Sequence, residues 1–151
     1  TGVQTCALPI FFGEYNPYVV LAFLSLIWIS DSAAYVFGVT FGKRPLFKSV
    51  SPKKSIEGFI GGLVFSVILS IVFFKFLMLE ISFYQWIILG VLTSCLGTLG
   101  DLVQSLFKRE AGVKDSGNLL PGHGGLYDRM DSIIFAAPII YLTLTIFNYV
   151  S

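Results

Sequence analysis

Residues 81–100 read ISFYQWIILGVLTSCLGTLG, a stretch of 20 residues without a charged side chain. Two further stretches, Gly58 to Phe74 and Ser132 to Ser151, are also free of charge. A helix of about 20 apolar residues is long enough to cross the hydrocarbon core of a membrane. These stretches therefore predict membrane-spanning helices.

The composition of the 151-residue chain agrees with a membrane protein. Apolar residues make up 55% of the sequence and charged residues 13%, whereas soluble domains carry about 25% charged residues. A formal net charge of +1 excludes a strongly basic nucleic-acid-binding protein. The two cysteines, Cys6 and Cys95, are too far apart for a disulfide framework.

The predicted fold is an all-α, polytopic bundle of about four membrane helices. Lipid cannot satisfy open backbone N–H and C=O groups, so each span is expected to be helical. The predicted spans cover residues 18–41, 58–79, 86–107 and 132–150. Residues 1–17 are left unassigned, because this start lacks the layout of a signal peptide and need not be native to the fold.

Basic residues predict the orientation of the bundle. Nine of the ten Lys and Arg residues lie in two loops, and the turn between the second and third spans has none. They are Lys43, Arg44, Lys48, Lys53 and Lys54 in the first loop, and Lys108, Arg109, Lys114 and Arg129 in the last. Cytoplasmic loops carry an excess of Lys and Arg, so both loops are expected on the cytoplasmic face.

Acidic residues within the predicted spans are candidates for a functional site. Asp31 lies in the first span and Asp101 in the third. An ionisable group inside the membrane costs free energy, so an acid at such a position is by default a functional-site hypothesis. Ser105 and Lys108 follow Asp101 by four and seven residues, so the three are expected on one helix face. The alternative for Asp31 is a hydrogen-bonded packing residue.

The polar loop from Lys108 to Asp131 has the composition of a phosphate and cation site. It contains four basic and four acidic residues, and its Pro and Gly residues allow tight turns and close approach to a ligand. Asp128 and Asp131 are three residues apart, and hard oxygen ligands beside Lys and Arg suit Mg²⁺ bridging phosphates. The alternative is that Asp131 and Ser132 only cap the fourth helix, with Asp128 in its first turn.

Two further positions are open to more than one interpretation. His123 is the only histidine, which excludes a multi-histidine zinc site; it is either a proton carrier or a hydrogen-bond donor to phosphate, or a residue that holds the shape of the loop. Ser51 and Pro52 predict a helix start, at which Lys53 and Lys54 would bind phosphate. The alternative is a basic anchor beside anionic lipid headgroups.

Many residues of the last loop have the spacing of a known family signature. These residues are Ser105, Lys108, Arg109, Lys114, Asp115, Gly117, Leu120, Pro121, His123, Gly124, Gly125, Asp128, Arg129 and Asp131. They resemble the phosphatidate cytidylyltransferases, also called CDP-diglyceride synthases. The resemblance extends upstream to three further segments. They are Gly100-Asp101, residues Ser51 to Gly58, and Asp31-Ser32-Ala33-Ala34-Tyr35.

The resemblance implies the C-terminal membrane portion, residues 18–151, of a longer enzyme that makes CDP-diacylglycerol and diphosphate from CTP and phosphatidate. It implies Mg²⁺, with a second cation left open, and a location in the inner cell membrane with the site facing the cytoplasm. CTP, phosphatidate and membrane lipid are the implied partners, without nucleic acid, and a homodimer is left open.

The resemblance also implies the site residues. The metal ligands are Asp101, Asp128 and Asp131. The other catalytic residues are Lys108, Arg109, His123 and Arg129. The substrate-binding residues are Asp31, Lys53, Lys54, Ser55, Ser105, Lys114 and Asp115.

Two other functions are weighed against this one. A CTP-dependent lipid kinase of the dolichol or phytol kinase type would release CDP instead of diphosphate. A transporter fragment would use its membrane acids to line an ion path. A transporter predicts acids spread across the membrane depth, whereas Asp101, Asp128 and Asp131 lie toward the end with the basic loops.

Overall fold

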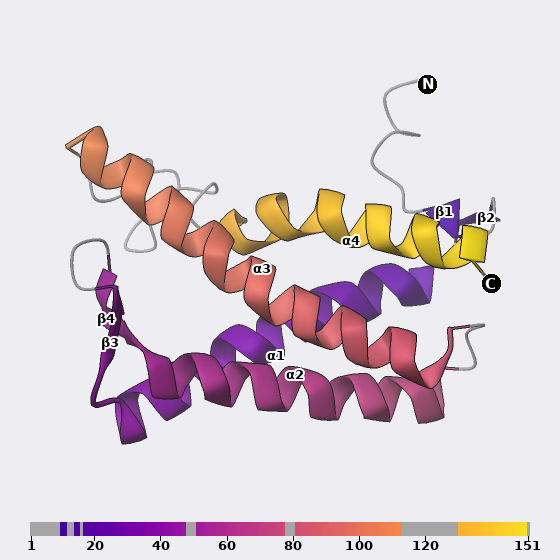
Figure 1. The fold of residues 1–151 in the computed structure, drawn as a ribbon, viewed down its shortest axis with the longest axis horizontal. Coiled ribbons are helices and arrows are strands. Elements are labelled where there is room, and N and C mark those ends of the chain that lie inside the picture. Colours follow the sequence, from indigo (N-terminus) through magenta and orange to yellow (C-terminus); the bar gives the residue numbers. More distant parts are fainter. Residues whose placement is uncertain are drawn as a thin grey trace.

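The structure, a computed structural model, describes residues 10–11, 14–15, 17–47, 51–77, 81–112 and 130–150. Its helices are α1 (Pro17–Phe41), α2 (Ile56–Phe76), α3 (Phe83–Glu110) and α4 (Asp131–Val150) (Figure 1). Four short strands form two antiparallel pairs, β1 (Ile10–Phe11) with β2 (Glu14–Tyr15) and β3 (Pro45–Phe47) with β4 (Ser51–Ser55).

The all-helical membrane fold predicted from the sequence is confirmed. Within the described residues, α1, α2 and α3 are long and apolar enough to cross a membrane. The ends of all four helices lie within three residues of the predicted spans. The short strand pairs lie outside these spans and were not predicted.

Small residues let α1 and α2 approach closely. A Cβ atom added at Gly62 would lie 2.7 Å from the Ser30 carbonyl oxygen, and one added at Gly58 would lie 2.6 Å from the Ala34 carbonyl oxygen. Small residues are favoured where membrane helices pack, because lipid gives no hydrophobic drive for association and close backbone contact is needed. The spacing of these glycines fixes the crossing of the two helices.

Helix α3 packs against both α1 and α2 through hydroxyl groups and glycine. The Ser66 hydroxyl of α2 donates to the Gly90 carbonyl of α3 at 2.9 Å. The Ser30 hydroxyl of α1 donates to the Ser94 hydroxyl of α3 at 2.9 Å. Ser30, Ser66 and Ser94 are all buried, so these hydrogen bonds lie within the bundle.

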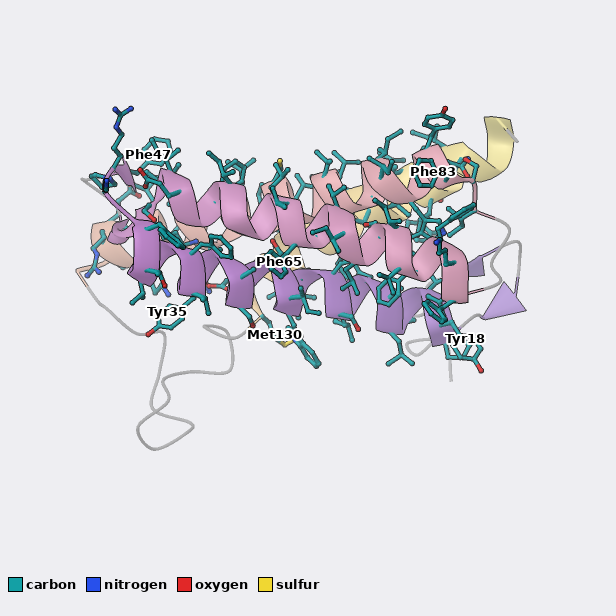
Figure 2. The ribbon with its side chains drawn as sticks, turned by 90° about the horizontal axis from the view of Figure 1, so that it is seen from below. Tyr18, Tyr35, Phe47, Phe65, Phe83 and Met130 are labelled. Carbon is teal, nitrogen blue, oxygen red and sulfur yellow. The ribbon has the colours of Figure 1, made fainter. Side chains whose placement is uncertain are left out.

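The outer surface of the bundle is apolar, as expected for contact with lipid. Large side chains point outward along the helices, Phe65 and Tyr35 among them (Figure 2). The apolar core includes Trp86 and Leu89 of α3 and Ile140 of α4. Apolar residues therefore cover both the interior and the exterior, which explains the small charged fraction of the sequence.

The predicted start of the second helix at Ser51 is wrong. Residues Ser51–Ser55 form β4, and Ser55 is the N-cap of α2, with its hydroxyl accepting from the Gly58 N–H at 3.1 Å. Pairing of β4 with β3 keeps the segment extended, and the Ile56 N–H continues this pairing by donating to the Arg44 carbonyl at 3.0 Å. The pairing was not predicted because it joins two segments that are separate in the sequence.

Candidate functional site

The polar segments of the chain meet at one end of the bundle. The C-terminal ends of α1 and α3, the β3–β4 pair and the N-terminus of α4 all lie toward the left in Figure 1. The C-terminal end of α2 and the N-terminal end of α3 lie at the opposite end. The described ends that flank the two basic loops thus lie on the same side of the fold.

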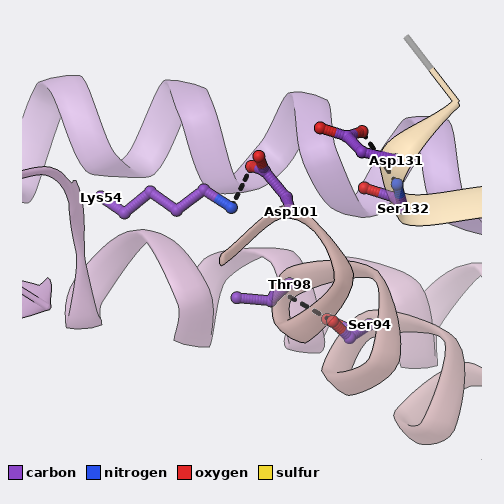
Figure 3. A network of polar contacts seen from close by, with 6 residues as sticks. All are labelled: Lys54, Ser94, Thr98, Asp101, Asp131 and Ser132. Carbon is purple, nitrogen blue, oxygen red and sulfur yellow. Dashed lines mark hydrogen bonds and ion pairs between the residues drawn. The ribbon is translucent and has the colours of Figure 1, made fainter. Parts of the chain in front are cut away.

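Lys54 and Asp101 form an ion pair at this end (Figure 3). Lys54 precedes the Ser55 cap of α2, and Asp101 lies in the part of α3 that approaches α4. Their side chains are 29% and 31% exposed, so water reaches both groups. The pair joins residues 47 positions apart, so its formation depends on the fold that brings the end of β4 within side-chain reach of α3.

Asp131 begins α4 next to Asp101. Its carboxylate accepts from the Ser132 N–H at 2.8 Å, which holds the side chain at the helix start. The carboxyl groups of Asp101 and Asp131 are within hydrogen-bonding contact of each other. Two carboxylates this close repel unless a proton or a cation lies between them, so the contact is suited to binding a cation.

Asp31 of α1 joins the same cluster. The Ser132 hydroxyl donates to the Asp31 carboxylate, and the charges of Lys54 and Asp101 also act on Asp31. Three carboxylates from three helices therefore gather at this end, with Asp101 acting on both Asp31 and Asp131. Asp31 is hydrogen-bonded, as expected for a packing residue, and it lies beside the other acids, as expected for a residue of the functional site.

Ser132 is a residue of this cluster that sequence analysis considered only as a helix cap. It donates through its backbone N–H to Asp131 and through its hydroxyl to Asp31. Its position directly after Asp131, at the start of a charge-free stretch, was the only signal in the sequence. Its contact with Asp31 depends on the packing of α4 near α1.

The predicted helix face of Asp101, Ser105 and Lys108 is present in α3. All three residues are partly buried, whereas the neighbouring Arg109 is exposed. Lys108 is close enough for its charge to act on Asp131. Lys108 therefore adds a second cation beside the carboxylates, and Arg109 faces outward.

The contacts of Ser55 are those of a packing residue. Besides capping α2, its hydroxyl would lie 2.8 Å from a Cβ atom added at Gly42 and 3.2 Å from one added at Gly38. The remaining predicted site residues have side chains outside the described part of the chain. They are Lys53, Lys114, Asp115, His123, Asp128 and Arg129.

A cation site formed by three or more Asp, Glu, His or Cys side chains is absent from the described residues. The contacting pair Asp101 and Asp131 nevertheless fits Mg²⁺, which typically takes one or two protein carboxylates and completes its octahedron with water and substrate phosphates. The predicted third ligand, Asp128, lies outside the described residues. The described donors thus suit a cation shared with a phosphate ligand.

Comparisons with known proteins identify relatives of this sequence. A family model described as the cytidylyltransferase family matches residues 7–147. The phosphatidate cytidylyltransferase of Staphylococcus saprophyticus is 46% identical over 127 residues, and that of Staphylococcus aureus is 48% identical over 129 residues. Each alignment covers 84% of this chain and 48% of the relative. The chain thus spans about half the length of these curated relatives.

Proposed function

Because the chain belongs to the cytidylyltransferase family, we propose that it is part of a phosphatidate cytidylyltransferase. This enzyme would transfer the cytidylyl group of CTP to phosphatidate and form CDP-diacylglycerol and diphosphate. The main structural support is the convergence of Lys54, Asp101 and Asp131 from three separate elements at one end of a membrane bundle. Carboxylates for a cation and an ammonium for phosphate are the groups that this reaction needs.

In the proposed reaction, a phosphate oxygen of phosphatidate attacks the α-phosphorus of CTP. The new P–O bond forms as the bond to the β-phosphate bridging oxygen breaks, and diphosphate leaves. The attacking oxygen is already anionic, so positioning and charge neutralisation account for most of the catalysis. No residue has to generate the nucleophile.

Each polar residue has a proposed part in this positioning. Asp101 and Asp131 would hold Mg²⁺ together with Asp128, and the bound ion would neutralise phosphate charge; a second cation is also part of this proposal. Lys54 lies beside Asp101 and Lys108 near Asp131, which supports the proposal that both lysines bind phosphate. The remaining proposed ligands of substrate are Asp31, Lys53, Ser55, Ser105, Arg109, Lys114, Asp115, His123 and Arg129.

The proposed location is the inner cell membrane, with the site open to the cytoplasm. The chain is a membrane protein by the length and apolar character of its helices. Its orientation is proposed from the excess of Lys and Arg in the two loops, because the described helix ends that flank these loops lie at one end of the bundle. Cytoplasmic exposure would give the site access to CTP. A homodimer remains part of the proposal.

A product assay tests the proposed reaction. Protein in phospholipid vesicles is incubated with phosphatidate, Mg²⁺ and CTP labelled at the α-phosphate. We expect label in CDP-diacylglycerol and one diphosphate released for each lipid product. A matched reaction with a lipid alcohol in place of phosphatidate is expected to give no labelled lipid. Release of CDP with phosphorylation of the alcohol would instead support a lipid kinase.

The orientation can be tested by labelling a cysteine in the last loop. With Cys6 and Cys95 replaced, Ser116→Cys is expected to react with a membrane-impermeant thiol reagent only from the cytoplasmic side, because its loop carries four of the basic residues. A cysteine at Ser82, between α2 and α3, is the matched control and is expected to react from outside. Labelling of Ser116→Cys in intact cells would contradict the orientation.

A further inference from the structure

We propose that Lys54 and the bound cation compete for the Asp101 carboxylate, and that cation binding transfers the Lys54 ammonium from Asp101 to a substrate phosphate. This inference rests on the proposed function, because it assigns the cation to Asp101 and Asp131. It adds a coupling between cation binding and phosphate binding. Lys54 would thus be a phosphate ligand that becomes available only after the cation is bound.

The first support is the ion pair itself. The Lys54 ammonium occupies a position on Asp101, the carboxylate that also contacts Asp131. The ammonium supplies part of the positive charge that a divalent cation would bring to this carboxylate. A divalent cation between Asp101 and Asp131 would repel the ammonium, because like charges at such separations interact unfavourably. The Lys54 ammonium and a divalent cation therefore cannot both contact Asp101 without strong electrostatic repulsion.

The second support is that the ion pair is weak enough to exchange. About three tenths of each side chain is exposed, so water screens the attraction between Lys54 and Asp101. The ammonium lies on a flexible stem of four methylene groups, which can change rotamer without movement of the backbone. Displacement by a divalent cation therefore requires only a side-chain movement.

The third support is that the backbone around Lys54 is fixed. Strand β4 pairs with β3, and Ser55 caps α2 directly after Lys54. The Glu57 carboxylate accepts from the backbone N–H groups of Lys43 and Arg44 at 3.2 and 3.3 Å, which ties the end of α1 to the start of α2. The anchor point of Lys54 thus stays near the acids while its ammonium moves.

The position of Lys54 also explains where the released ammonium would go. Its charge acts on Asp31 as well as on Asp101, so the side chain lies among the carboxylates that would surround the cation. Substrate phosphates bound to that cation would be the nearest anions left without a partner. An ammonium offers three donors to phosphate oxygens, and its transfer would make cation and nucleotide binding mutually favourable.

The first measurement is cation affinity without nucleotide, with Mn²⁺ as the probe and electron paramagnetic resonance as the readout. Lys54→Met removes the competing ammonium, and we expect Mn²⁺ to bind roughly three- to tenfold more tightly. Lys54→Arg keeps a competing charge and is expected to bind Mn²⁺ about as the parent does. Lys75→Met is the matched control, since Lys75 is exposed in the last turn of α2, at the other end of the bundle.

The second measurement separates exchange from a general effect of charge. The affinity for a non-hydrolysable CTP analogue is measured with and without Mn²⁺ in the parent and in Lys54→Met. We expect the substitution to weaken analogue binding when Mn²⁺ is bound and to leave it almost unchanged without Mn²⁺. Without Mn²⁺ the Lys54 ammonium of the parent stays on Asp101 and does not contact the analogue, so its removal changes little. A lysine that acts only through long-range charge would weaken analogue binding equally in both conditions.

Two outcomes would overturn the exchange. One is equal loss of analogue affinity with and without Mn²⁺, and the other is unchanged or weaker Mn²⁺ binding by Lys54→Met. Both measurements are repeated with Lys54→Gln, which has a second neutral side chain. Thermal unfolding, compared with that of the parent, checks that this variant is folded. Failure of the proposed function is a different result, namely parent protein that binds Mn²⁺ but forms no CDP-diacylglycerol.

Discussion

Turnover of the Asp131→Asn protein is expected to fall by roughly a hundredfold or more, the loss typical when a group that stabilises developing charge is removed. The amide keeps the shape of the side chain and can still accept from the Ser132 N–H, so α4 should begin at the same residue. What it loses is the negative charge that faces Asp101. Formation of CDP-diacylglycerol and Mn²⁺ binding measure this loss directly.

Glu110→Gln is the matched control for Asp131→Asn. Glu110 ends α3 and is exposed, so removal of its charge should leave both turnover and Mn²⁺ affinity near those of the parent. Parent-level turnover of Asp131→Asn with an unchanged dependence on Mg²⁺ would remove Asp131 from the cation site.

Gly100→Ala is expected to reduce turnover by about a hundredfold while the protein stays in the membrane. A Cβ atom at this position would lie 2.6 Å from the Phe135 Cβ atom and 3.0 Å from the Asp131 carbonyl oxygen, so α4 must move. A displacement of about 1 Å between reacting groups can cost a factor of this order in rate. The overpacking itself should destabilise the fold by about 1–3 kcal/mol, which thermal unfolding can detect.

Gly97→Ala is the matched control on the same side of α3. Its added Cβ atom would lie 3.6 Å from the Ser132 Cβ atom, an ordinary van der Waals contact. Because Ala favours a helix over Gly by about 1 kcal/mol, this variant should be as stable as the parent or slightly more so. Equal turnover of the two alanine variants would mean that the approach of α4 to Gly100 does not position Asp131.

The sequence was sufficient to predict the helices because their signal is local. Charge-free stretches such as residues 81–100 can be recognised without knowledge of their neighbours, and α3 begins two residues into this one and continues ten residues past its end. The resemblance to the family is likewise confirmed by the match over residues 7–147. The start of α2 was wrong because Ser51 has the features of a cap, and only its pairing with Phe47 keeps it in a strand.

The site could be predicted only in part. Asp31, Lys54, Asp101 and Asp131 were each named from the sequence, and the structure brings them together. Their partners could not be predicted, because the contacts of Lys54 with Asp101 and of Ser132 with Asp31 depend on how the helices pack. The assignments of Asp128, His123 and Arg129 remain predictions, since these residues lie outside the described part of the chain.

The length of α3 has a consequence for how the proposed enzyme would meet its lipid substrate. The helix rises about 27 Å between Phe83 and Asp101, close to the roughly 30 Å thickness of the hydrocarbon core. With Phe83 at one edge of the hydrocarbon core, Asp101 would lie near the opposite edge, just beneath the phosphate groups of that leaflet. Phosphatidate would then react while its acyl chains stay in that leaflet. The rate would depend on the surface density of phosphatidate among the other lipids. For CTP, it would depend on the concentration in bulk solution.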